Sequence, residues 1–225
     1  MKQVFSPNFN DRDPSIGLDY IVLHYTGMKD AESAMMRMCD PNAEVSAHYV
    51  IGEDGGVTQL VVEKNRAWHA GKSFWRGQMD MNSASIGIEL INPGHEFGYR
   101  AFPAAQISAL KPLLREIIAR HDMNPVACLL GHSDIAIGRR FDPGELFPWR
   151  ELAREGLGLW PEITRPGLAT EAEMAALLKA IGYDVVNIHE TLLAFQRRFQ
   201  PGNVTGFPNT ETAPRLRAVK QRMCD

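Results

Sequence analysis

The sequence has few cysteines, no block of like charges and no long apolar run, and each shortage excludes a class of protein. Its three cysteines, Cys39, Cys128 and Cys224, lie far apart, so they form neither a disulfide framework nor a thiolate metal cluster. The net charge is −3 and no basic block occurs, which argues against nucleic acid or an anionic membrane as a partner. No apolar run approaches the ~20 residues that span a bilayer.

The first residues also have little of what a secretory leader requires. Residues 1–13 contain no apolar segment and no small-residue cleavage site. The sequence as given therefore favours a cytoplasmic location, with the periplasm as the alternative. It fixes neither the compartment nor the oligomeric state.

The remaining composition, with 44% hydrophobic and 23% charged residues, is typical of a globular protein. β-branched and apolar runs predict strands, and apolar residues at the i, i+3, i+4 period predict helices. Strands are expected over residues 20–25, 46–51, 57–62, 85–91 and 126–130, and helices over residues 31–38, 103–121 and 147–157.

The pattern changes near residue 157, which predicts a boundary between two domains. Residues 1–157 form the first domain, and residues 158–168 are punctuated by Gly and Pro as in a linker. Residues 169–225 then predict a small all-α domain. Its expected helices cover residues 171–181, 186–199 and 211–223, the first of them capped by Thr170 and stopped by Gly182.

Two histidines and an aspartate stand where predicted strands end and loops begin. His24 lies near the end of the first strand, His132 follows the last strand and a glycine, and Asp142 lies in a Gly/Pro-rich loop. Two imidazoles and a carboxylate leave a fourth position open on zinc, which is typical of hydrolytic zinc sites. Spacing alone leaves two alternatives open, namely a core histidine at position 24 and a turn aspartate at position 142.

Five motifs occur in an order that carries a family resemblance. They are LHYTG (23–27), SAHYVI (46–51), AWHAG (67–71), SIGIEL (85–90) and GHSDIA…DPG (131–144). With them, residues 18–150 resemble the N-acetylmuramoyl-L-alanine amidase type 2 family, which are zinc amidases related to phage amidases and peptidoglycan recognition proteins. More weakly, residues 168–225 resemble the three-helix peptidoglycan-binding module often attached to such enzymes. The resemblance implies an α/β fold, a mixed central sheet flanked by helices, with zinc at one end of the central strands.

The resemblance also implies roles for individual residues. His24, His132 and Asp142 match the zinc ligands, and Glu89 matches the catalytic glutamate. Glu89 lies in the apolar run 86–91, where an unpaired carboxylate is costly. Burial should raise its pKa, which suits a general base that takes a proton from water. The alternative is a solvent-facing glutamate on an edge strand.

His48, Trp68 and His69 are predicted to lie near the substrate. The zinc ligand set is complete without His48, so a structural or substrate-contacting role is expected for it, since a fourth protein ligand would close the site. The resemblance places the AWHAG loop at the rim of the cleft, where Trp68 and His69 would contact sugar or peptide. A packed tryptophan beside a surface histidine is the alternative.

One stretch departs from the family pattern. Where relatives often carry Pro, Lys and Thr, this sequence has Ile137, Arg140 and Phe141. The lysine position assists the transition state in several relatives. Arg140 keeps the positive charge but does not give up a proton, because the guanidinium pKa exceeds ~12. We therefore expect Arg140 to stabilise an oxyanion rather than to act as a general acid.

The function that the resemblance implies is hydrolysis of the amide between N-acetylmuramic acid and L-alanine, in peptidoglycan or its fragments, with Zn²⁺ as cofactor. Two rivals are a non-catalytic peptidoglycan-recognition protein on the same fold and a zinc hydrolase of an unrelated amide. The site chemistry is expected to be complete within residues 18–150, leaving the C-terminal helices to bind wall or a partner. The sequence does not distinguish intact wall from released 1,6-anhydro fragments.

Overall fold

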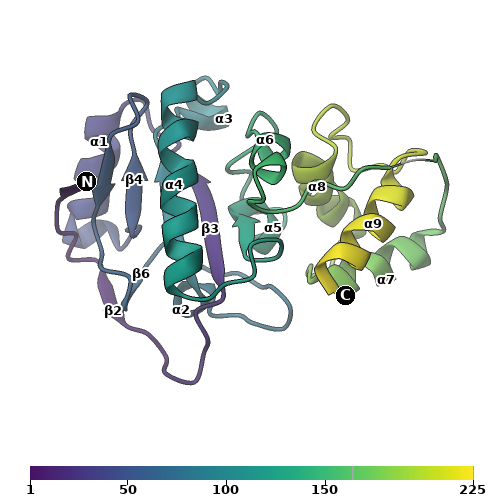
Figure 1. Cartoon of the computed structure of the whole chain (residues 1–225), viewed down its shortest axis with the longest axis horizontal. Coiled ribbons are helices and arrows are strands. Elements are labelled where there is room, and N and C mark those ends of the chain that lie inside the picture. The colour runs from purple at the N-terminus through teal and green to yellow at the C-terminus, as the bar shows by residue number, and fades with distance from the viewer. Residues whose placement is uncertain (164, 225) are drawn as a thin grey trace.

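The computed structural model describes residues 1–163 and 165–224. Within these residues, helices flank a six-stranded mixed sheet, and three further helices form the C-terminal part of the chain (Figure 1). The predicted fold class is confirmed. Residue 164 of the predicted linker, residue 225 and the Cys224 side chain lie outside the described part, whereas Cys39 and Cys128 are free thiols.

The sheet has the strand order β1-β5-β4-β7-β3-β8. Strands β4, β7, β3 and β8 run parallel to one another, whereas β5 pairs antiparallel with β4. The carboxyl ends of parallel strands meet at one edge of a sheet, which is where open α/β folds bind their ligands. The strands are β1 (Lys2–Gln3), β3 (Tyr20–Tyr25), β4 (Tyr49–Ile51), β5 (Val57–Gln59), β7 (Ser85–Leu90) and β8 (Leu129–Gly131), with β2 (Phe9–Asp11) and β6 (Asn65–Ala67) forming a separate antiparallel pair.

Helix α4 (Ala104–Arg120) covers one face of the sheet (Figure 1). Its apolar positions recur at the predicted helical period, and Leu110 and Leu114 pack in one cluster with Ile21 and Leu23 of β3. Successive side chains of a strand point to opposite faces, so Val22 and His24 face away from α4. Val22 accordingly belongs to a different apolar cluster. The sheet is thus buried on both faces, which explains its near-continuous apolar strands.

The helices predicted over residues 31–38, 103–121 and 147–157 form with their ends shifted by up to three residues, whereas the short helices Met81–Ala84, Gly94–Phe97 and His132–Ile135 were not predicted. Three predicted strands are at least three residues shorter than expected, since residues 46–48 and 126–128 lie in loops before β4 and β8, and residues 60–62 lie beyond the end of β5. Among the described residues, no helix combines the length and apolarity needed to cross a bilayer. The helices of the first part are α1 (Ala31–Cys39), a 3-10 turn (Pro41–Ala43), α2 (Met81–Ala84), α3 (Gly94–Phe97), α5 (His132–Ile135) and α6 (Trp149–Arg154).

The C-terminal helices form where they were predicted, as α7 (Glu171–Ile181), α8 (Ile188–Phe199) and α9 (Thr212–Cys224). Thr170 caps α7 by accepting the Glu173 N–H at 3.2 Å.

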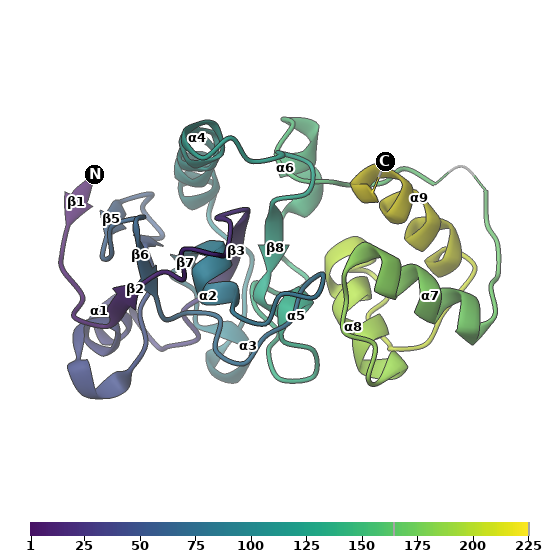
Figure 2. The same ribbon diagram turned by 90° about the horizontal axis from the view of Figure 1, so that it is seen from below.

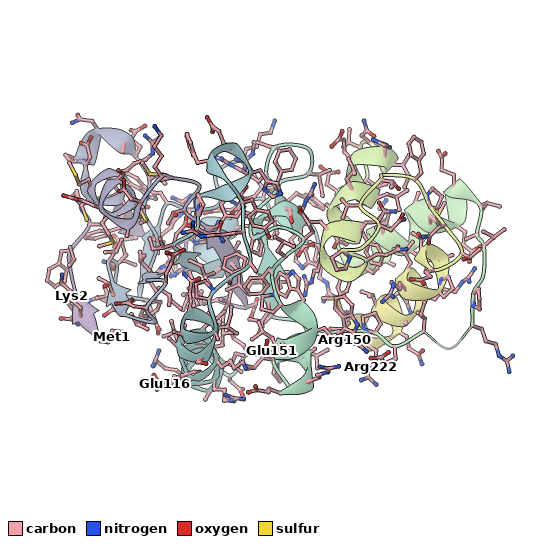
Figure 3. All side chains as sticks on the ribbon, turned by 90° about the horizontal axis from the view of Figure 1, so that it is seen from above. Met1, Lys2, Glu116, Arg150, Glu151 and Arg222 are labelled. Atoms are coloured by element: carbon pink, nitrogen blue, oxygen red, sulfur yellow. The ribbon has the colours of Figure 1, made fainter. Side chains whose placement is uncertain are left out.

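These helices do not stand apart from the sheet. One apolar cluster joins Val22 of β3, Leu130 of β8 and Ile135 of α5 to Leu178 of α7 and Phe195 of α8. Figure 2 shows α8 beside α5, and in Figure 3 side chains fill the junction between the two parts of the chain. The C-terminal helices therefore cover the β8 side of the sheet on the face opposite α4.

Candidate active site and metal centre

Strand register brings three of the predicted site residues to one edge of the sheet. His24 of β3 is paired with Glu89 of β7, and Leu23 is paired with Gly131 of β8, which His132 follows directly. In-register neighbours on parallel strands point to the same face. His24, Glu89 and His132 therefore lie side by side at the carboxyl ends of the strands.

Asp142 reaches the same place from the loop that follows α5. The backbone N–H of Ser133 donates to the Asp142 carbonyl at 2.9 Å, which ties the end of this loop to the start of α5. The Asp142 side chain is buried and turns toward the two histidines.

Three atoms of these residues form a nearly equilateral triangle. The Nδ1 atoms of His24 and His132 are 2.9 Å apart, and each lies 3.0 Å from Oδ2 of Asp142. Among the described residues, these three are the group of His, Cys, Asp or Glu side chains with an arrangement that could hold a metal ion.

The hydrogen bonds on the far side of the rings set the tautomers. Nε2 of His132 lies 3.1 Å from the Ala70 carbonyl, which only accepts, so this nitrogen carries the hydrogen and Nδ1 is left with a lone pair. Nε2 of His24 lies 3.1 Å from Nδ1 of His69, and the same tautomer of His24 results when His69 accepts there. Two ring lone pairs and a carboxylate oxygen then converge within 3.0 Å, an arrangement that a bound cation stabilises.

The electrostatics of the cluster agree with a neutral His24 beside an ionised Asp142. Burial and the nearby His132 lower the pKa of His24 to about 4, although Asp142 opposes the shift. Burial alone would raise the pKa of Asp142, but His132 and His24 outweigh it and hold that pKa well below its usual range. Burial and the surrounding rings also lower the pKa of His69. A deprotonated carboxylate beside neutral imidazoles is the state that binds a metal.

The cluster lies in a cavity of about 580 Å³, and Glu89 lines the same cavity. Oε2 of Glu89 is buried and finds no hydrogen-bond partner within the described residues. Burial, with the charge of Asp142 adding to it and Arg140 opposing it, raises the pKa of Glu89 to about 8. An unpaired carboxylate with a raised pKa in a cavity has the properties of a general base.

Comparison with known proteins identifies the family. Residues 12–145 match the family described as N-acetylmuramoyl-L-alanine amidase. The chain belongs to this family. The curated N-acetylmuramoyl-L-alanine amidase AmiD of Escherichia coli is 36% identical over 90% of this chain and 82% of its own length. The 1,6-anhydro-N-acetylmuramyl-L-alanine amidase AmpD of Haemophilus influenzae is 30% identical over 66% of this chain and 88% of its own length.

Solved structures of amidases have the same fold as this chain. AmiD from E. coli, in complex with the substrate anhydro-N-acetylmuramic acid-L-Ala-D-gamma-Glu-L-Lys, has a TM-score of 0.83 at 31% identity and covers 97% of this chain and 99% of its own. AmpDh3 from Pseudomonas aeruginosa, in complex with anhydromuramic pentapeptide, has a TM-score of 0.81 at 31% identity and covers 97% and 98%. Both matches extend over the C-terminal helices as well as the sheet.

The three residues predicted to contact substrate lie in different surroundings in this amidase. His69 lines the cavity and contacts His24, with its ring packed against Gly87, where any Cβ would collide with it. His48 is fully buried beside His69 and accepts the Gly87 N–H at 2.9 Å. Of the structural and substrate-contacting roles expected for His48, these contacts support the structural one. Trp68 does not line the cavity, and its indole N–H donates to Asn10 at 2.8 Å.

Arg140 lines the cavity and is exposed. Its neighbour Arg139, which sequence reasoning missed, donates to the carbonyls of Ala70 and Lys72 at 2.7 and 2.6 Å. The Ala70 carbonyl is the one that His132 contacts, so Arg139 helps to hold that ring. The paired arginines between His132 and Asp142 were the available signal, but a sequence does not show which of them turns inward.

Proposed function

We propose that this chain is a zinc amidase that hydrolyses the amide between the lactyl group of N-acetylmuramic acid and L-alanine. The observation that carries the proposal is the triangle of His24, His132 and Asp142 beside the unpaired carboxylate of Glu89 in one cavity. A non-catalytic recognition protein would have no need for both a complete ligand set and a general base. The alternative of an unrelated amide is disfavoured by the identity shared with named muramoyl amidases.

The ligand atoms fit zinc in number, type and spacing. Zinc binds histidine nitrogen and carboxylate oxygen at about 2.0–2.2 Å, which places tetrahedral ligand atoms about 3.3 Å apart. The 2.9–3.0 Å edges of the observed triangle are close to that value. Three protein ligands leave one position for water or substrate, as in catalytic zinc sites.

When bound, zinc polarises the scissile carbonyl and lowers the pKa of water. Glu89 is placed to take a proton from the attacking water and to return it to the leaving amine of L-alanine. The guanidinium of Arg140 supplies positive charge for the oxyanion of the tetrahedral intermediate without transferring a proton. His69 and the Ala70 carbonyl hold the rings of His24 and His132 in their ligating orientation.

The 1,6-anhydro form of N-acetylmuramic acid is the substrate form that we propose. AmiD and AmpDh3 were each solved with an anhydromuramic peptide, and both match nearly the whole of this chain.

The test of the proposed amide cleavage is hydrolysis of an anhydromuramoyl tripeptide in ¹⁸O-labelled water, followed by mass spectrometry. One label in the muramic carboxyl group and an unlabelled peptide with free L-alanine are expected, whereas label in a peptide carboxyl group would contradict the proposal.

Arg140→Met is expected to lower kcat about 10²-fold, as for the loss of one oxyanion donor, while Arg140→Lys keeps most of the activity. The reason is that lysine retains the charge at the cavity wall and methionine does not. Steady-state kinetics on the anhydromuramoyl tripeptide is the measurement. Full activity in Arg140→Met would remove this residue from the mechanism.

His69→Phe is expected to weaken zinc binding about 10–100-fold, the usual effect of losing a group that supports a ligand. Phenylalanine keeps the ring against Gly87 but cannot accept from Nε2 of His24. Trp68→Phe is the matched control in the same loop, since Trp68 contacts Asn10 rather than a ligand. Zinc affinity is measured by competition with a chelator, and equal affinity in the two variants would mean that His69 does not support His24.

A further inference from the structure

Helix α8 of the C-terminal part contacts the segment that carries His132. Nη1 of Arg198 lies 2.7 Å from Oδ2 of Asp134, and both side chains are almost fully buried. Nη2 of the same guanidinium donates to the Leu129 carbonyl at 2.7 Å. One arginine from α8 therefore bonds to residues on both sides of the ligand His132.

Asp134 connects this arginine to the backbone around the ligand. Its Oδ2 also accepts the Gly131 N–H at 2.8 Å, and its Oδ1 accepts the hydroxyl of Tyr183 at 2.7 Å. Tyr183 belongs to the turn between α7 and α8 and is buried against Trp75. Both oxygens of Asp134 are thus satisfied, and two of their three partners come from beyond the predicted linker.

A second contact from α8 reaches the loop that carries the other ligand. The guanidinium of Arg197 lies over the Phe141 ring, 4.9 Å from its centroid, and 3.8 Å from the Glu145 carboxylate. Phe141 directly precedes Asp142. Helix α8 therefore contacts the chain next to two of the three ligand residues.

We propose that Arg198 and Tyr183 are positioning residues that hold His132 in place for the metal, so that the C-terminal helices complete the site. The inference rests on the proposed ligand role of His132. It changes the expectation that the site is complete within residues 18–150, because the ordering of residues 129–136 depends on side chains beyond residue 158.

The physical reason is that this segment has little support of its own. Helix α5 covers only His132–Ile135, and so short a helix is not stable without tertiary contacts. A buried carboxylate whose cationic partner is removed is left with an uncompensated charge, which drives the segment to rearrange toward water or another donor. The Gly131 N–H bond to Asp134, and with it the placement of His132, changes as a result.

The coupling is reciprocal, as thermodynamic linkage requires. If α8 orders the segment that binds the metal, then metal binding must stabilise the contact of α8 with that segment. Zinc is therefore expected to slow backbone hydrogen exchange in residues 183–199 of the wild-type chain. In Arg198→Met this protection of α8 is expected to be lost.

The test compares four full-length variants by zinc affinity and by backbone hydrogen exchange of the metal-free protein. Arg198→Met and Tyr183→Phe remove the contacts to Asp134, and Arg198→Lys keeps the charge without the two-armed contact. Val219→Ala is the control for general loss of stability, because Val219 is buried on α9, which packs on α7. Tyr183→Phe keeps the ring and all charges, so it decides the question if Arg198→Met does not fold.

Arg198→Met is expected to weaken zinc binding about 10–100-fold, Tyr183→Phe several-fold, and Arg198→Lys less than Arg198→Met. Backbone hydrogen exchange of residues 129–136 should be faster in these variants than in Val219→Ala. The comparison is made between variants whose melting temperatures are equal. Wild-type zinc affinity and exchange in Arg198→Met or Tyr183→Phe would overturn the inference. A wild-type chain that binds no zinc would instead contradict the proposed function, and the exchange of the metal-free proteins would still decide the inference.

Discussion

Replacing Glu89 with glutamine is expected to leave zinc bound and to lower kcat on an anhydromuramoyl tripeptide by about 10²–10⁴-fold. The amide has nearly the shape of the carboxylate but does not accept a proton, so the attacking water loses its base. Because Glu89 is not part of the ligand triangle, the metal content should stay that of the wild-type chain.

Glu96→Gln is the matched control, since Glu96 also lines the cavity but is exposed. It exchanges a cavity-lining carboxyl group for an amide, as Glu89→Gln does, and is expected to keep kcat within a few-fold of the wild-type value. Wild-type kcat in Glu89→Gln, or an equal loss in both variants, would exclude Glu89 as the general base.

Replacing His132 or Asp142 with alanine is expected to abolish activity by removing the metal. Either change leaves two ligands, and the loss of zinc affinity should exceed the ~10–100-fold that follows from losing a mere supporting hydrogen bond. The sheet should still fold, because its core is built from apolar side chains that pack against α4. The measurements are metal content by elemental analysis and circular dichroism.

His95→Ala is the control for these ligand variants, because His95 lines the cavity but lies outside the triangle. Its ring stacks on Tyr99 at 4.2 Å and approaches Glu145, so a change in substrate affinity is expected without loss of metal. Near-stoichiometric zinc in His132→Ala and Asp142→Ala would show that the ion, if present, is held elsewhere.

Much of the fold follows from local patterns. The apolar run Tyr20–Tyr25 forms β3, and Thr170 and Gly182 bound α7 as their capping preferences predict. These features depend on neighbours in sequence, so a single chain shows them. Strands β4 and β8 begin three residues later than predicted, at Tyr49 and Leu129, because apolar runs do not show where pairing with a neighbouring strand starts.

The candidate site was predictable only in part, for a reason that lies in tertiary structure. The sequence motifs predicted His24, Glu89, His132 and Asp142 as site residues. The pairing of β3 with β7 and β8, which brings the ends of these strands together, is a tertiary feature that the motifs do not show. The contact of Arg198 with Asp134 was not predictable, because the two residues lie 64 positions apart and the pattern of α8 predicts only an amphipathic face.

The most direct test of the account is an anomalous difference map, measured at the zinc absorption edge on crystals of the zinc-loaded protein. The account predicts one strong peak about 2.0–2.2 Å from Nδ1 of His24, Nδ1 of His132 and Oδ2 of Asp142, facing the Glu89 carboxylate. A peak at other side chains, or no peak at this triangle in protein that turns over substrate, would contradict it.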